Sequence, residues 1–377
     1  MKENALNMST SIDLPRPSRS LVILSRLLFS PGPNAPSAST ATGFDLSLPP
    51  LNREEFDDLV TLGDLNHVVV RALDIAFGVL CDARDTMRAE WVSAALATER
   101  ARIENAVSHL HAICTAFEEE GLDATVIKSL DHWPDLGSDL DMYTNADPEK
   151  VIALMAKRFQ AELAPRSWGD RLACKWNFVI PGLPEAVEIH MGRLGQTGEQ
   201  TALAARIAAR ARAIRVAGRN FRVPHASDRL LISTLQRMYR HFYFRLCDIV
   251  DTTELAESGA LDYQDLRASA EASGIWEGAA TYMKIVSDYG RQYRGAGLDL
   301  PRFVLDEARF GGDQIYFARD FLRVPIMPQS ARLYGTQLGG LLRRRELHSS
   351  ARLGLLPWLA TAAAVGQKIT GSDKGIW

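Results

Sequence analysis

The feature that most constrains the fold of this chain is a change in the spacing of its apolar residues near residue 120. From about residue 52 to 120, apolar residues recur every three or four positions, as do Ile103, Val107 and Leu110, which is the spacing of amphipathic helices. Gly121 follows, a residue type that often ends helices. Beyond it come short β-branched and alternating stretches, which predict strands. This order predicts a mostly helical α+β protein with a small mixed sheet between two helical segments.

The predicted strands are short and lie close together in the chain, at 124–127, 140–143, 176–180 and 186–190. A Pro-Gly-Leu-Pro turn joins the last two strands. Asp147-Pro148 predicts the start of a helix that runs to about Gln160. After residue 201, helical spacing returns. We expect a short helix at 21–28, one long helix from Asp228 to about Leu255, and shorter helices from Tyr263 to about Arg319.

Composition and apolar spacing together predict five parts of the chain. They are a flexible tail (1–17), an N-terminal helical segment (18–120) with a Pro/Ser-rich loop (30–50), an α/β core (121–200), a C-terminal helical domain (201–330) and a basic, apolar tail (331–377). The N-terminus lacks a signal-peptide pattern, and no apolar stretch reaches the ~20 residues of a membrane span. We therefore expect a cytoplasmic protein. Its net charge of −3 gives no reason to expect a nucleic-acid binder driven by overall charge.

An acidic pair is the main candidate for chemistry. Asp139 and Asp141 are two residues apart on a predicted strand, so both project from one face, about 7 Å apart at Cα. Such carboxylates repel each other unless a cation lies between them. Two Mg²⁺ ions, or Mn²⁺, are the usual cations in phosphoryl chemistry. Gly137 and Ser138, directly before the pair, offer an approachable backbone and a hydroxyl for a phosphate.

An Asp-x-Asp pair alone is more often a solvated turn than a site. Two further residues favour a site: Lys128 ends the preceding strand, and Glu188 lies on a strand about fifty residues later. A third carboxylate can bind a metal that activates the acceptor, or take the acceptor's proton. His190 shares the face of Glu188. It either orients that carboxylate or packs at the sheet edge.

Four segments together resemble a known family. They are Val126–Leu130, Pro134–Tyr143, Val187–His190 and Arg245–Asp251. These motifs are similar to those of the bacterial uncharacterised nucleotidyltransferase-like family, within the DNA polymerase beta-like nucleotidyltransferase superfamily. The resemblance covers roughly residues 20–300 and is carried by the four motifs jointly.

The resemblance implies transfer of a nucleoside monophosphate from an NTP to an acceptor, with release of pyrophosphate. Asp139, Asp141 and Glu188 would be the catalytic and metal-binding residues. Lys128, Ser129, Gly137, Ser138 and Arg245 would bind the nucleotide. The acceptor is left open between a small molecule, a protein and an RNA, and the oligomeric state is also open.

Two departures from the family pattern keep a second hypothesis open. The family normally has glycine where this chain has Ser129, and a side chain there can hinder the approach of a phosphate. The Gly-Ser pair of the superfamily usually lies farther ahead of the acidic pair than Gly137-Ser138 does here. The alternative is a catalytically degenerate, nucleotide-binding regulatory protein.

Other candidates have competing interpretations. Arg237, Arg240, His241, Arg245 and Asp248 share a face of the predicted long helix, and either line the cleft or form a solvated face with internal ion pairs. The arginines from Arg206 to Arg222 either attract RNA, which gives a third hypothesis of an RNA-binding helical scaffold, or form a solvated face. Nucleic acid is not the favoured partner. Trp133 and Trp168 either stack on a base or pack. The tail containing Trp358 either lies on a membrane surface or packs on helices.

Overall fold

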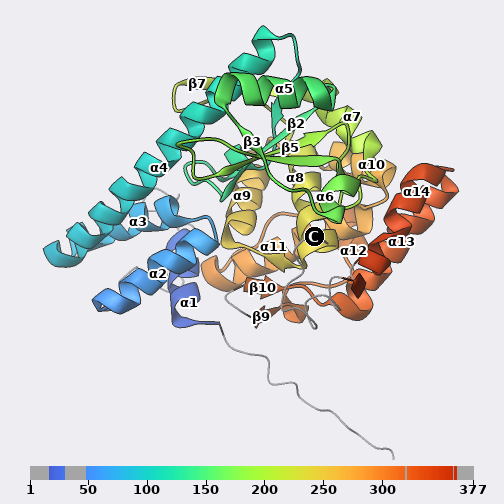
Figure 1. The fold of residues 1–377 in the computed structure, drawn as a ribbon. Coiled ribbons are helices and arrows are strands. Elements are labelled where there is room, and N and C mark those ends of the chain that lie inside the picture. Colours follow the sequence, from blue (N-terminus) through green and yellow to red (C-terminus); the bar gives the residue numbers. More distant parts are fainter. Residues whose placement is uncertain (1–16, 30–47, 319–320, 360, 363–377) are drawn as a thin grey trace, which may run out of the picture.

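The computed structural model describes residues 17–29, 48–318, 321–359 and 361–362 of the 377-residue chain (Figure 1). Most of the predicted flexible tail (1–17) and Pro/Ser-rich loop (30–50) lies outside the described residues. So does the end of the predicted C-terminal tail, from residue 363. The domain boundaries given above stay a prediction.

The N-terminal part is helical, as predicted. Its helices are α1 (Arg19–Phe29), α2 (Arg53–Leu65), α3 (Val69–Asp82) and α4 (Thr86–Glu119). α2 begins at a capping box. The Asn52 side chain accepts a hydrogen bond from the backbone N–H of Glu55, and the Glu55 side chain accepts one from the backbone N–H of Asn52. This arrangement satisfies N–H groups that a helix start leaves free. α4 ends just before Gly121, whose φ of 67° is the left-handed conformation that favours glycine.

The sheet is small and mixed, which confirms the predicted α+β class. It contains β1 (Thr125–Val126), β2 (Asp139–Thr144), β3 (Glu162–Leu163), β4 (Lys175–Val179) and β5 (Ala186–Met191), in the order β1-β2-β5-β4-β3. β2 and β5 are parallel neighbours, and the other pairs are antiparallel. α5 (Pro148–Phe159) connects β2 to β3 and begins at the predicted cap, Asp147. α6 (Trp168–Ala173) precedes β4.

The two faces of the central strands differ in polarity. Leu140 and Met142 of β2, with Val187 and Ile189 of β5, are buried in one hydrophobic cluster with residues of α4 and α5. Alternation along a strand places the intervening residues on the opposite face. That face carries all the acidic residues singled out on these strands. One apolar and one polar face is the arrangement that the alternating sequence predicts.

The prediction of one long helix from Asp228 to about Leu255 is wrong, because the helix is interrupted in its middle. It forms α8 (Ala226–Thr234), a π-helical segment η2 (Leu235–His241), β8 (Tyr243–Phe244) and α9 (Leu246–Glu257). Phe242 has a φ of 54°, which ends the helical path. β8 pairs with β10 (Phe321–Arg323), which pairs with β9 (Tyr316–Ala318). The strand partner is about eighty residues away in sequence, so local periodicity cannot show it.

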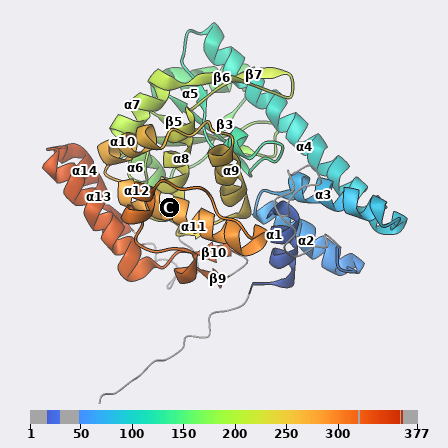
Figure 2. The same ribbon diagram turned by 180° about the vertical axis from the view of Figure 1, so that it is seen from behind.

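The remaining elements lie mostly below and beside the sheet, apart from one hairpin, which packs beside α4 (Figures 1 and 2). They are η1 (Ser129–His132), α7 (Thr201–Arg210), the hairpin β6 (Arg212–Val216) and β7 (Arg219–Val223), α10 (Tyr263–Ser273), α11 (Trp276–Arg294), α12 (Arg302–Glu307), η3 (Gly312–Gln314), η4 (Ile326–Ser330), α13 (Ala331–Arg343) and α14 (Leu347–Gly354). The predicted helices after Tyr263 are present up to Glu307, whereas β9 lies within the span that was predicted helical.

α1 is separated in sequence from the C-terminal helices but packs among them. The hydroxyls of Ser25 and Tyr289 lie 2.6 Å apart in a buried contact, and the rings of Phe29 and Tyr289 meet edge to face.

Among the described residues, no helix is long and apolar enough to cross a membrane.

Candidate active site

A polar cavity of about 210 Å³ lies over the polar face of β2 and β5. The sheet side contributes Asp139, Asp141 and Glu188. The opposite wall comes from η2 and the start of α9, which contribute Arg237, Arg240, His241 and Arg245. The acidic residues predicted from sequence therefore share one cavity with basic residues from the C-terminal helical layer.

The register of the two parallel strands brings the carboxylates together. Asp141 of β2 is the direct partner of Glu188 on β5, so their side chains leave the same face as neighbours. Glu188 is buried, Asp141 is half-buried and Asp139 is exposed. The three acids thus run from the floor of the cavity to its mouth.

Lys128 reaches into the space between the acids. Its Nζ lies 2.5 Å from Oδ1 of Asp141 and 3.7 Å from Oε1 of Glu188. The backbone of Lys128 has φ 62° and ψ −57°, and the N–H of Ser129 bonds to the carbonyl of Ile127 at 2.7 Å. These values describe a γ-turn of a kind that is rare and strained. Strain of this kind concentrates at functional sites, where the surrounding structure holds it.

Lys175 and His190 complete the surroundings of Glu188. Nζ of Lys175 lies 2.8 Å from Oε2 of Glu188 and 2.9 Å from Oδ1 of Asp170. Nε2 of His190 lies 2.9 Å from Oε1 of Glu188. His190 therefore orients the carboxylate, one of its two predicted roles. Lys175 was missed, although β4 alternates and pairs antiparallel with β5, which puts residues Lys175 and Asn177 on the face of Glu188.

The electrostatics of the acids follow from this packing. Burial raises the pKa of Asp141 to about 7, with Lys128 opposing the shift and Glu188 adding to it. Desolvation and the Glu188 charge also raise the pKa of Asp139. Burial alone would raise the pKa of Glu188, but Lys128, His190 and Lys175 hold it well below its usual range. Glu188 is thus the acid that stays ionised most firmly.

Ser129 holds the backbone of the acidic strand. Its hydroxyl accepts a hydrogen bond from the N–H of Asp141 at 2.7 Å and donates one to the carbonyl of Asp139 at 3.3 Å. The side chain that departs from the family's glycine is therefore buried against β2. Gly137 and Ser138 also line the cavity, with Gly137 beside the ring of His67 and Ser138 exposed.

The opposite wall is built by the break after η2. Arg237 is fully buried, and its Nε lies 2.7 Å from Oδ2 of Asp248. Asp248 also accepts a hydrogen bond from the N–H of Arg245 at 2.7 Å, so it fixes the start of α9. Nη1 of Arg237 and Nε of Arg245 are buried without a hydrogen-bond partner among the described residues. Unsatisfied guanidinium groups beside a cavity suit an anionic ligand.

These residues share the cavity although the helix predicted to carry them is broken. Arg237, Arg240, His241 and Arg245 line the cavity, and their contact with a nucleotide or acceptor stays a prediction. Asp248 does not line the cavity. Its carboxylate instead holds Arg237 and the backbone of Arg245 in place. Burial, together with Arg240 and Arg237, lowers the pKa of His241 well below its usual value, so its imidazole is neutral.

Two histidines that sequence reasoning missed form the end of the cavity. The rings of His67 and His132 stack with centroids 5.7 Å apart. Burial, Arg245 and His132 lower the pKa of His67 to about 2, so its Nε2 accepts from Nη1 of Arg245 at 2.5 Å. His67 lies between α2 and α3 and His132 lies at the end of η1, and neither belongs to a sequence motif that would have singled it out.

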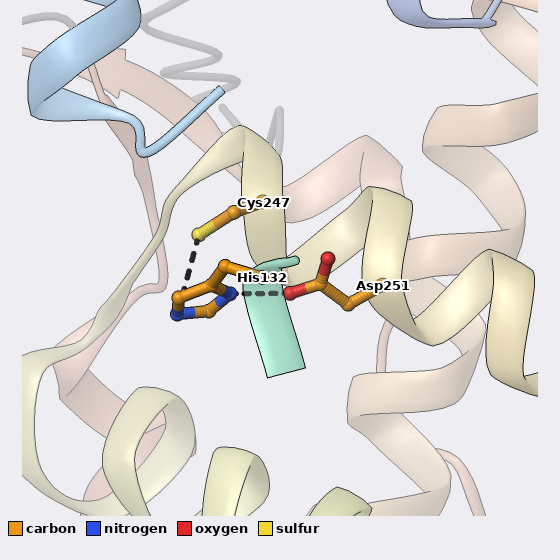
Figure 3. A group of neighbouring side chains, drawn as sticks. All are labelled: His132, Cys247 and Asp251. Atoms are coloured by element: carbon orange, nitrogen blue, oxygen red, sulfur yellow. Dashed lines mark hydrogen bonds and ion pairs between the residues drawn. The ribbon is translucent and has the colours of Figure 1, made fainter. Parts of the chain in front are cut away.

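His132 belongs to a network of polar side chains, and Figure 3 shows its contacts with Cys247 and Asp251. Its Nδ1 lies 2.5 Å from Oδ2 of Asp251, and its Nε2 lies 4.0 Å from Sγ of Cys247. The other oxygen of Asp251 lies 2.7 Å from Nη1 of Arg71. Arg71 also pairs with Asp135 at 2.9 Å. The network ties the loop between β1 and β2 to α3 and α9.

Four arginines of the basic stretch from Arg206 to Arg222 form ion pairs with acidic residues. Arg206 pairs with Asp228 and Asp265 at 2.7 Å each, and Arg210 pairs with Asp265. Arg219 pairs with Glu104, and Arg222 with Asp123. These acids come from segments outside the basic stretch. Trp133 and Trp168 are exposed and are absent from the cavity lining.

The donor set of the cavity fits divalent cations. Asp141, Glu188 and His190 bring one ligand atom each within 4.8 Å of one another, and Asp139 adds a carboxylate at the mouth. Carboxylate oxygens are the ligands that Mg²⁺ prefers. The ammonium of Lys128 already bridges Asp141 and Glu188, which shows that the space between these acids accepts positive charge.

No protein-family model matches the chain, and no curated protein sequence matches it either. The solved structure of an antigenic nucleotidyltransferase-like protein from Paracoccidioides brasiliensis is similar at 12% identity and a TM-score of 0.30. The match covers 45% of this chain and 87% of that one. Likeness at that score does not bear on the activity of this chain, so the family suggested by the motifs remains an expectation.

Proposed function

We propose that this chain is a nucleotidyltransferase that moves a nucleoside monophosphate from an NTP to an acceptor, with release of pyrophosphate. The observation that carries the proposal is the opposition of charges across one cavity. Asp139, Asp141 and Glu188 project from adjacent strands, and the facing wall holds Arg237 and Arg245 with unsatisfied donors. Transfer from a triphosphate requires acids that hold cations on one side of the site and arginines that hold phosphates on the other.

In this proposal, each side of the cavity has its own task. Asp139, Asp141 and Glu188 would hold Mg²⁺ or Mn²⁺, which would neutralise charge on the phosphates. Lys128 would move from Asp141 to the triphosphate when metal enters. Lys175 and His190 keep Glu188 ionised and oriented through contacts of 2.8 and 2.9 Å. Arg237 and Arg245 would position the phosphates, so catalysis here is mainly positioning and charge neutralisation.

One observation favours the alternative of a nucleotide-binding regulatory protein without turnover. The ammonium of Lys128 lies 2.5 Å from Asp141, in the space where the transferase would place a metal. If Lys128 stays there, nucleotide still meets the arginine wall but metal is excluded. Binding to the folded state raises apparent stability in either case, so only turnover separates the two proposals.

The test is a reaction of the purified chain with Mg²⁺, each of the four NTPs in turn, and a small-molecule and protein extract as acceptor source. Transfer predicts Mg²⁺-dependent pyrophosphate release and a product heavier by one nucleoside monophosphate in mass spectra. NTP-dependent thermal stabilisation without either product would support the regulatory alternative. Absence of both stabilisation and product with all four NTPs would contradict both.

A further inference from the structure

A larger cavity, of about 710 Å³, lies beside the candidate active site. Its walls are η2, the segment before α7, and the C-terminal elements η4, α13 and α14. Most of its surface is apolar, with Leu235, Phe242, Met327, Tyr334, Leu353 and Leu356 among its lining residues. Its volume is within the range of about 300–1,000 Å³ of small-molecule sites. Nothing in the proposed nucleotide site uses this space.

The two cavities share part of their walls. Arg240 and His241 line both. A third cavity, of about 50 Å³, is also lined by Arg240. Its other lining residues include Leu235, which also lines the large cavity, and Lys128, which also lines the candidate active site. A molecule held in the large cavity therefore meets the carboxylate site at Arg240.

Arg240 is the unusual residue at this junction. It is half-buried, yet it makes no hydrogen bond or ion pair with any residue that the structure describes. Arg237, one turn earlier, has Asp248 as its partner. Keeping a guanidinium partly buried without a counterion costs free energy, and its planar donors match a carboxylate or phosphate. The junction is thus complementary to an oxyanion.

Two of the three acids of the proposed active site are held by neighbouring side chains, whereas Asp139 is exposed. Both oxygens of Glu188 are engaged, one by Lys175 and the other by His190. Asp141 is engaged by Lys128. A hydroxyl acceptor must lose a proton as it reacts. A carboxylate or phosphate acceptor arrives already deprotonated and needs no group to take its proton.

We propose that the large cavity is the acceptor site and that the acceptor is amphipathic, with an apolar body in the cavity and a carboxylate or phosphate monoester at Arg240. This inference rests on the proposed nucleotidyl transfer. In the step, an oxygen of the acceptor anion forms a bond to the α-phosphorus of the NTP. The bond from that phosphorus to the bridging oxygen breaks, and pyrophosphate leaves with the bonding electrons. No proton changes place.

Binding is tested on the full chain without NTP, by displacement of the fluorescent fatty acid 11-(dansylamino)undecanoic acid. The competitors are dodecanoic acid, dodecyl phosphate and dodecan-1-ol, which share one apolar chain. We expect at least one of the anions to bind about tenfold or more tightly than the alcohol, because a hydrogen bond to a charged partner contributes that much. The stronger of the two anions identifies the source of the oxyanion.

Paired variants locate the binding. Arg240→Gln should weaken binding of the preferred anion about tenfold or more and leave the alcohol unchanged, whereas Arg343→Gln, on an exposed residue of α13, should change neither. Ala331→Trp, which fills the cavity from an exposed lining position, should weaken all three ligands. Gly335→Trp is its control, since a Cβ at Gly335 meets nothing within 4 Å.

Failure to bind any amphiphile, or equal binding of anion and alcohol that Arg240→Gln leaves unchanged, would overturn the acceptor assignment alone. The same chain, given Mg²⁺, each NTP and the preferred anion, should release pyrophosphate. Normal anion binding without pyrophosphate release under those conditions would instead overturn the proposed transfer.

Discussion

The hydroxyl of Ser129 accepts a hydrogen bond from the backbone N–H of Asp141 at 2.7 Å and donates one to the carbonyl of Asp139 at 3.3 Å. One buried side chain thus sets the backbone of both acids. Ser129→Ala leaves the Asp141 N–H without its acceptor, so we expect a loss of about 1–3 kcal/mol in the free energy of unfolding. Urea denaturation measures this loss.

The control for Ser129 is Ser138→Ala. Ser138 is exposed, and its hydroxyl has only a 3.5 Å contact with Asp139, so we expect a change within about 0.5 kcal/mol. Equal stability of the two variants would show that the Ser129 hydroxyl does not hold β2.

Lys175 is predicted to stabilise the sheet through Glu188 and Asp170. Its side chain is 9% exposed and lies within 3 Å of both carboxylates. Lys175→Met leaves Glu188 buried with less compensation, which should lower the free energy of unfolding by at least about 2 kcal/mol. Lys157→Met removes the same charge from an exposed position and should have little effect. Similar urea midpoints for the two variants would contradict the assigned role of Lys175.

The His132–Asp251 pair predicts a pH-dependent contribution to stability. Burial disfavours charge on His132, but the Cys247 sulfur and the Asp251 carboxylate raise its pKa well above the usual value. Burial raises the pKa of the Cys247 thiol itself, so Asp251 supplies the negative charge. A group with a raised folded-state pKa stabilises fully below its unfolded pKa, about 6.5, and loses this contribution as pH rises through the folded value.

The measurement is the difference in unfolding free energy between the wild type and His132→Gln, taken at several pH values from 6 upward. We expect the difference to be largest near pH 6 and to shrink at alkaline pH. His109→Gln, at a half-buried histidine on α4, is the control. A difference for His132→Gln that stays constant with pH would contradict an ionised pair.

Local patterns predicted the acidic side of the site well. Alternation placed Asp139 and Asp141 on one strand face and Glu188 on another, and the parallel register brought Asp141 beside Glu188. The helix start at Asp147 followed from a side chain that caps free N–H groups. These predictions succeed because strand alternation and capping act over a few residues.

The basic side depended on long-range contacts. β8 exists because Leu322 and Arg323 pair with it, and no local period contains that information. For the same reason, the sequence did not show that Asp265 and Asp228 neutralise Arg206. Lys175 is a different case. The predicted strand began one residue after it, at Trp176, and extending the alternation by one residue places Lys175 on the same face as Asn177, the register partner of Glu188.

The central claim is that the carboxylates of β2 support transfer from an NTP. Its most direct test is the rate of Mg²⁺-dependent pyrophosphate release by Asp139→Asn with Asp141→Asn. The control is Asp123→Asn with Asp306→Asn, which makes the same charge change at positions about 70% exposed. We predict a loss of about 100-fold or more for the β2 pair and a wild-type rate for the control. Equal rates in wild type, control and a folded β2 variant would contradict the assignment of the site.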